Sequence, residues 1–127
     1  MKSIEELNPH NLETNQVIDK NLVILYERLE ELQDAIGIDL VINSGLRSQE
    51  AQNKLIAAKK SKAVNSLHLV GAAADIKDKD GKIAKWVMSN LNFMKIIGLW
   101  IESPDYCKGW VHVQIFPPKS GNRVFIP

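Results

Sequence analysis

Residues 66–75, SLHLVGAAAD, predict a turn that leads into a strand. They place a histidine before the turn and an aspartate in the strand, seven positions apart. Gly71 permits a sharp change of direction, and the three alanines after it leave room for a ligand beside the backbone. Alternate residues of a strand share a face, so Asp75 points to one side of the expected strand and Ile76 to the other. His68 is expected to approach Asp75 from the preceding loop.

Residues 109–116 alternate in polarity and predict a strand near the C-terminal end. One row of this strand is apolar and faces the core: Val111, Val113 and Ile115. The other row points away from the core: Trp110, His112, Gln114 and Phe116. Residues 99–103 predict the preceding strand, close enough for an antiparallel pair, with Trp100 and Glu102 on its outward face. Glu102 and His112 are therefore expected to rise from one face of a hairpin, and Asp75 meets His112 if its strand joins the sheet.

Two imidazoles and a carboxylate on three separate elements form a ligand set for Zn²⁺. His68, Asp75 and His112 would leave the fourth tetrahedral position open, and an open position makes zinc a catalyst for hydrolysis. The chemistry also needs a base for the attacking water. Glu102 is the candidate by strand facing, and Asp105 on the following connection is the alternative. Taken singly, each residue also fits a plainer role, such as a core histidine, a strand-end acid or an exposed strand residue.

Arg47 follows the apolar run 40–42, which predicts a short strand ending at the turn Ser44-Gly45. Its guanidinium could hold a developing oxyanion or a substrate carboxylate through two parallel hydrogen bonds. The alternative is a surface charge at the start of a helix. Gln114 and Trp110 on the outward face of the last strand could line a substrate groove, but an exposed polar strand residue and an indole packed under a loop explain them equally well.

Helical spacing of leucines predicts a helix over residues 21–36, with Gly37 as its stop and Asn11 or Thr14 as possible caps before it. Further helices are expected over 48–60, with Leu55 and Ile56 facing inward, and over 83–91 and 93–97. Helices therefore come first and then alternate with short strands. This order predicts an α+β fold with a small, mostly antiparallel sheet.

The composition excludes several classes of function. A chain of 127 residues suits one domain, 1–127, and its net charge of +1 gives no basis for binding nucleic acid or an anionic membrane. Cys107 is the lone cysteine and lies outside any metal-binding spacing, which predicts a buried bystander. Residues 1–6 carry charges and no apolar run, so the sequence predicts synthesis in the cytoplasm without a signal peptide. No run approaches the length of a membrane span.

The stretch 66–75 resembles the Ser-x-His-x-x-Gly-x-Ala-x-Asp motif of the zinc D-Ala-D-Ala carboxypeptidases and their relatives, which include vancomycin-resistance dipeptidases and phage L-alanyl-D-glutamate endolysins. Every fixed position of that motif matches. Residues 42–48, INSGLRS, resemble the family's Ser-Gly-Tyr-Arg-Ser turn, with Leu46 in place of the aromatic residue. Residues 110–113, WVHV, resemble its final Trp/Phe-x-His element. The three segments occur in the family's order.

The resemblance implies a fold shared with the hedgehog signalling domain, a small antiparallel sheet with helices packed on one side. It implies His68, Asp75 and His112 as zinc ligands, Arg47 as the group that binds a substrate carboxylate or the oxyanion, and Ser66 as a support of the site through hydrogen bonds. The chain departs from many relatives at the base, because Gly109, Val113 and Gln114 stand where those relatives carry acidic residues. Glu102 resembles a glutamate found before the final element in small phage-type members.

The expected function is zinc-dependent hydrolysis of a peptide bond in the stem peptides of peptidoglycan, of the D-Ala-D-Ala carboxypeptidase or L-Ala-D-Glu endopeptidase type. By analogy, such a protein works as a monomer in phage or prophage lysis and acts on the cell wall once released. One alternative is a metal-stabilised module that binds the cell wall or belongs to a virion and does not catalyse. Another is an α+β domain without metal, which elemental analysis would identify.

Overall fold

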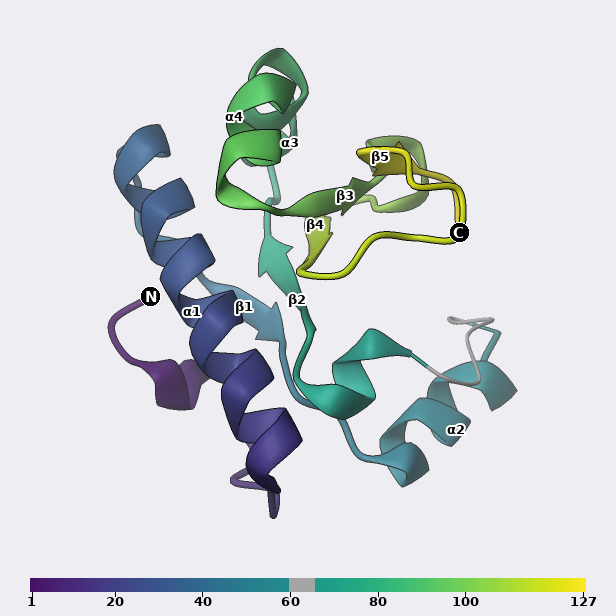
Figure 1. Ribbon diagram of the computed structural model, residues 1–127. Coiled ribbons are helices and arrows are strands. Elements are labelled where there is room, and N and C mark those ends of the chain that lie inside the picture. Colours follow the sequence, from purple (N-terminus) through teal and green to yellow (C-terminus); the bar gives the residue numbers. More distant parts are fainter. Residues whose placement is uncertain (60–65) are drawn as a thin grey trace.

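The computed structural model describes residues 1–59 and 66–127, and in this part of the chain five strands form one sheet in the order β1-β2-β4-β3-β5. The strands are β1 (Ile42–Ser44), β2 (Ala73–Lys77), β3 (Trp100–Glu102), β4 (Trp110–Gln114) and β5 (Val124–Phe125). Neighbouring strands are antiparallel except β3 and β5, which are parallel. The strands β2 and β4, which carry two of the expected ligands, are therefore adjacent at the centre of the sheet (Figure 1).

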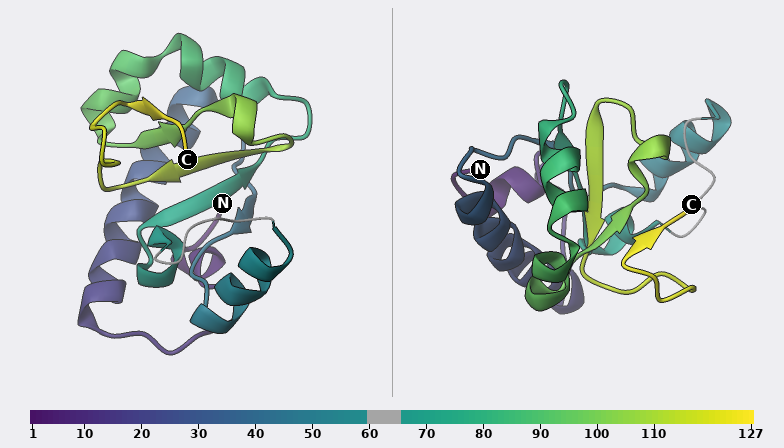
Figure 2. Two further views of the ribbon diagram at one scale, coloured as in Figure 1. Left: turned by 90° about the vertical axis from the view of Figure 1, so that its right-hand side faces the viewer. Right: turned by 90° about the horizontal axis from the view of Figure 1, so that it is seen from above.

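Helices and short 3-10 turns accompany the sheet. They are η1 (Ile4–Leu7), α1 (Gln16–Ile36), α2 (Gln49–Ala57), η2 (Leu67–Val70), α3 (Lys82–Ser89), α4 (Leu91–Ile97) and η3 (Pro104–Tyr106). The views of Figure 2 show α1, α3 and α4 on one side of the sheet, and α2 beyond the other side. This arrangement confirms the predicted α+β class with a small, mostly antiparallel sheet, although α2 stands apart from the other helices.

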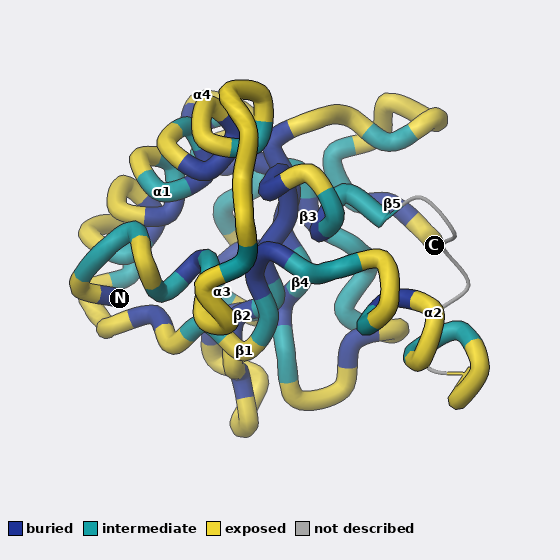
Figure 3. Tube along the Cα trace, turned by 90° about the horizontal axis from the view of Figure 1, so that it is seen from below, coloured by how far each residue is buried: buried dark blue, intermediate teal, exposed yellow. Residues whose placement is uncertain are grey.

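The core lies between the sheet and the three helices on its covered face. The leucine stripe of α1 is fully buried there: Leu22, Leu25, Leu29 and Leu32. It packs with the inward row of the strands, which includes Ile76, Ile101, Val111 and Val113. Figure 3 shows the central strands buried, while the outer faces of the helices are exposed. Because burial of such a side chain contributes about 1.5–3 kcal/mol, this layer stabilises the sheet and fixes which row of each strand faces outward.

The first helix begins earlier than its leucine spacing predicts. α1 starts at Gln16, and the side chain of Asn15 accepts a hydrogen bond from Ile18 N at its N-terminus. Asn11 and Thr14, the caps expected from the sequence, are therefore wrong. The first turn of α1 contributes Ile18 to the core but no leucine, and this is why the leucine spacing did not reveal it. Gly37 ends the helix in the left-handed conformation, as predicted.

The short helix α2 differs most from expectation. It begins one residue later than expected, because Ser48 is its cap and accepts a hydrogen bond from Ala51 N. Leu55 and Ile56, expected to face inward, are only half-buried, and the residue that α2 buries completely is Gln52. The expected end of this helix at residue 60 lies outside the described residues. The side chain that α2 buries most deeply is thus a polar one.

Gly71 connects η2 to β2 at a point where a side chain would be strained and crowded. Its φ is +73°, in the left-handed region that favours glycine, and a Cβ there would lie 2.9 Å from Leu22 Cγ. The carbonyl of the preceding Val70 accepts a hydrogen bond of 2.9 Å from the side chain of Asn21 on α1. The turn that carries His68 is therefore anchored to the longest helix, and it enters β2 at a defined angle.

Within residues 1–59 and 66–127, no helix is both long and apolar enough to cross a membrane.

Candidate metal centre

One row of side chains crosses the open face of the sheet and contains most of the expected site. Ser44 on β1 pairs with Asp75 on β2, and Asp75 pairs with His112 on β4. Between β4 and β3, Val113 pairs with Ile101 and Gln114 pairs with Trp100. Continuing this register by one residue places Glu102 opposite His112. The strand alternation that predicted Asp75 and His112 to meet is confirmed.

His68 approaches this row from η2 and is 3 % exposed. Its Nδ1 lies 2.9 Å from the carbonyl oxygen of Gly45. A carbonyl oxygen only accepts hydrogen bonds, so Nδ1 carries a proton, and Nε2 faces Asp75 Oδ1, 3.3 Å away. The backbone N–H of His68 donates to Ser66 Oγ at 3.2 Å, and its carbonyl accepts from Arg47 N at 3.0 Å. Backbone and side chain are therefore both fixed.

His112 lies on the other side of Asp75. Its Nδ1 is 2.9 Å from Asp75 Oδ1, and its Nε2 is 2.9 Å from Gln114 Oε1. Its ring stands edge-on to His68, with 5.2 Å between the centroids, and packs against Phe125 at 6.0 Å. The side chains of His112 and Asp75 retain 14 % and 16 % exposure. The group is therefore held firmly, yet solvent and a small ligand can reach it.

The close packing of these groups shifts their pKa values. Burial acts to raise the pKa of Asp75, but hydrogen bonds and positive charge from His112 and His68 outweigh it and hold that pKa well below its usual range. Burial acts to lower the pKa of His112, but the hydrogen bond and charge of Asp75, with smaller effects of Gln114 and Glu102, raise it overall. Without metal, both shifts favour an imidazolium beside a carboxylate.

Arg47 reaches the row from the turn after β1. Its Nη2 donates to Ser44 Oγ at 2.8 Å and lies 3.7 Å from Asp75 Oδ2, while its Nη1 donates to the buried Gln52 Oε1 at 2.7 Å. Burial lowers the pKa of Arg47 and the charge of Asp75 raises it again, and a guanidinium stays charged throughout. Sequence reasoning found Arg47 but missed Gln52, because a glutamine in a helix gives no signal that it is buried.

Glu102 lies on the site face, as strand alternation predicted, and its charge acts on the pKa of His112. Its Oε2 accepts a hydrogen bond of 2.7 Å from the thiol of Cys107. Cys107 is buried, as expected, and burial together with the hydrogen bond to Glu102 raises the pKa of its thiol, so it stays protonated. The sequence did not reveal this contact, because it depends on the η3 turn between the two residues.

Trp100, Trp110 and Asp105 are not among the three ligand candidates. Arg123 stacks on the ring of Trp100, with 4.2 Å from its Cζ to the centroid, so Trp100 packs under the segment that precedes β5. Its indole N–H is buried and has no hydrogen-bond partner within residues 1–59 and 66–127. Trp110 is half-buried at the first position of β4. Asp105, the alternative base, is exposed in η3.

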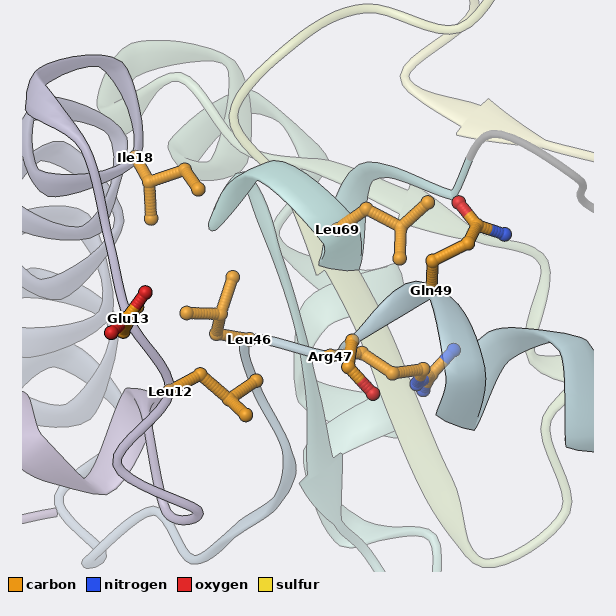
Figure 4. A pocket seen from close by; sticks show the side chains of 8 residues that line it. Leu12, Glu13, Ile18, Leu46, Arg47, Gln49 and Leu69 are labelled. Carbon is orange, nitrogen blue, oxygen red and sulfur yellow. The ribbon is translucent and has the colours of Figure 1, made fainter.

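A cavity of about 380 Å³ lies beside the turn that carries Arg47. Leu12, Ile18, Leu46 and Leu69 give it an apolar lining. Figure 4 shows the guanidinium of Arg47 pointing away from Leu12 and Leu46. None of the three ligand candidates lines this cavity, so it is a neighbour of the candidate metal centre and not part of it.

The residues present fit a zinc ion. One donor atom from each of His68, Asp75 and His112 can be chosen so that all three lie within 4.8 Å of one another. Two imidazoles and a carboxylate are a donor set typical of catalytic zinc. The second ring nitrogen of each imidazole lies within hydrogen-bond distance of a protein oxygen to which it can donate its N–H, as in zinc-binding histidines. Zinc is therefore the cofactor that this donor set suits.

Comparison with known proteins supports the same conclusion. A family model described as Peptidase M15 matches residues 3–114, which include all three ligand candidates. Comparison with curated proteins and with solved structures gave no significant match. The match covers most of the chain and confirms the resemblance that the motifs indicated. The chain belongs to the Peptidase M15 family, whose members are zinc-dependent metallopeptidases.

Proposed function

We propose that this protein hydrolyses a peptide bond in the stem peptides of peptidoglycan, as a D-Ala-D-Ala carboxypeptidase or an L-Ala-D-Glu endopeptidase, with zinc held by His68, Asp75 and His112. The observation that carries the proposal is the convergence of these donor atoms within 4.8 Å on a partly exposed face. Zinc bound there would polarise the scissile carbonyl and make an attacking water more acidic. The residues around it supply the other functions of a peptidase.

Glu102 takes the proton of the attacking water and passes it to the leaving amine. Its place beside His112 in the row supports this role, and the thiol of Cys107 keeps the carboxylate oriented by donating to Oε2. Arg47 binds the negative charge of the substrate. A guanidinium has five N–H donors, and its contacts with Ser44, Gln52 and Asp75 leave donors for a substrate oxygen.

The other substrate-binding candidates differ in what supports them. Ser66 lies beside the site and accepts from the backbone of His68, which fits a supporting role more directly than contact with substrate. Trp110 is half-buried and can offer its ring to a peptide. Gln114 is 6 % exposed and both ends of its amide are paired within the protein, which favours a different role. We also propose that residues 1–127 act as one domain and as a monomer, in a phage or prophage lysis context.

The test is a digest of purified cell-wall stem peptides, with zinc content measured on the same preparation. Cleavage that a chelator abolishes and added zinc restores is the expected result, and mass spectrometry of the products identifies the bond. Protein that holds one zinc ion but cleaves no stem peptide would sink the enzyme assignment. If that protein still binds the peptides, it is instead the metal-stabilised binding module.

A further inference from the structure

We propose that Gln114 is a positioning residue of the metal centre, whose side-chain oxygen holds the Nε2–H of His112 and so presents Nδ1 of that ring to the metal. The inference rests on the metal site of the proposed function and adds a residue that controls it. It also replaces the substrate-binding role expected of Gln114 from the sequence.

The orientation of the Gln114 amide follows from its second contact. One end of the amide lies 2.9 Å from the carbonyl oxygen of Phe116, which only accepts hydrogen bonds. The NH₂ group must therefore be at that end, and the oxygen Oε1 must face His112 Nε2 at 2.9 Å. The hydrogen bond to the carbonyl of Phe116 thus prevents the amide from flipping.

This orientation determines which nitrogen of His112 is available. An acceptor at Nε2 stabilises the tautomer that carries its proton there, and the lone pair of the neutral ring is then on Nδ1. Nδ1 is the nitrogen that lies 2.9 Å from Asp75 Oδ1, on the side of His68. If Oε1 were absent, the proton could sit on either nitrogen, and the ring would lose the contact that fixes its angle.

The surroundings of Gln114 keep it in place. It pairs with Ala73 on β2 and with Trp100 on β3, so a strand flanks it on each side. With 6 % exposure, its amide is largely shielded from competing hydrogen bonds to bulk water. A buried amide satisfied at both ends is rigid, because rotation would leave polar groups unpaired at a cost of about 1–3 kcal/mol.

The two histidines of the site are thereby held in complementary ways. His68 donates its Nδ1–H to a backbone carbonyl, that of Gly45, and offers Nε2. His112 donates its Nε2–H to a side chain, that of Gln114, and offers Nδ1. Because the support of His112 is a side chain, substitution can remove it without altering the backbone.

The experiment compares zinc affinity, by competition with a chelating dye, in wild-type protein and three variants. Gln114→Met removes the acceptor while keeping the length of the side chain, and zinc binding is expected to weaken about 10- to 100-fold. Gln114→Glu keeps an acceptor at the same reach and is expected to recover most of that affinity. Gln33→Met is the matched control: Gln33 is a half-buried amide on α1 that bonds Met1 and Leu40, and its loss should lower stability without changing zinc affinity.

A second measurement needs no variant. Nitrogen-15 NMR of the zinc-loaded wild type is expected to show His112 protonated at Nε2, with a slowly exchanging proton. A proton on Nδ1 of His112 would overturn the proposal, and so would wild-type zinc affinity in Gln114→Met or a Glu variant no better than the Met variant. Wild-type protein that binds no zinc would instead contradict the metal site itself, so the two failures are distinguishable.

Discussion

In the proposed function, Glu102 is needed for catalysis but not for metal binding. Glu102→Gln keeps the shape of the side chain but removes the ability to take a proton, so kcat on stem peptides should fall about 10²- to 10⁴-fold. Zinc content should not change, because Glu102 is not among the three ligand candidates. The measurement is a steady-state assay on both proteins at equal zinc loading.

Asp105→Asn is the matched control for this substitution. Asp105 is exposed in η3, and its conversion to an amide should leave kcat unchanged. If Asp105→Asn were inactive and Glu102→Gln active, the base would be Asp105, the alternative that the sequence left open.

The charge pair of Asp75 and His112 gives the metal-free protein a pH-dependent stability. The pKa of His112 is raised on folding, so its contribution is complete below the unfolded value of about 6.5 and is lost as pH rises through the folded pKa. The pKa of Asp75 is lowered, so its contribution is present above about 3.9 and is lost as pH falls through the folded pKa. Urea unfolding in chelator should therefore show falling stability above neutral pH.

Asp75→Asn provides the comparison for the pH experiment. Without the carboxylate, the main cause of the raised pKa of His112 is gone, and the decline of stability on the alkaline side should disappear. A wild-type curve that is flat between pH 6 and pH 9, to about 0.5 kcal/mol, would contradict the charge pair.

The sequence predicted some of these residues and not others, for a physical reason. Asp75, His112 and Glu102 were placed together because strand alternation is periodic and depends only on the backbone. The contact of Cys107 with Glu102 and the locked amide of Gln114 depend on side-chain torsions and on one turn. Such features have no period in the sequence.

At the scale of elements, α3 depends on a carboxylate outside the helix. Asp78 is buried, and its two oxygens accept hydrogen bonds of 2.9 Å from Ile83 N and Ala84 N at the start of the helix. Asp78→Ala leaves both donors without a partner and should destabilise the protein by about 1–3 kcal/mol. Chemical denaturation measures this difference.

Asp80→Ala in the same turn is the control. Asp80 is exposed, accepts from Lys82 N at 3.2 Å and forms only a surface ion pair with the Lys82 side chain, so its loss should cost less than about 1 kcal/mol. Equal effects of the two substitutions would show that α3 does not depend on the buried carboxylate of Asp78.

Element boundaries were less predictable than element types. β5 is two residues long and pairs parallel with β3, and so short a strand has no periodic pattern in its own sequence. Likewise, β1 covers Ile42–Ser44 and not the apolar run 40–42, because Leu40 is buried in the core outside the strand ladder. Apolar runs in the sequence identify buried residues, whereas backbone pairing between segments determines which residues form a strand.

For the whole molecule, metal binding would be coupled to folding, because the three ligand candidates come from η2, β2 and β4. Zinc at about 100 times its dissociation constant should add about 2.7 kcal/mol to the free energy of unfolding. The thermal midpoint should rise by roughly 10 °C, measured by circular dichroism with and without chelator. Magnesium, which prefers oxygen ligands, should leave the midpoint unchanged at the same concentration. An equal rise with magnesium would contradict a site of two imidazoles and one carboxylate.

Zinc binding would require the native alignment of the strands, because the site residues form a row across the sheet. A slip of one residue in the pairing of β2 with β4 would turn His112 or Asp75 to the covered face and separate the donor atoms. Only the native alignment can therefore gain the free energy of metal binding, and misaligned forms of the same sheet cannot. These strands are short, and bound metal would favour their native pairing over misaligned pairings during folding.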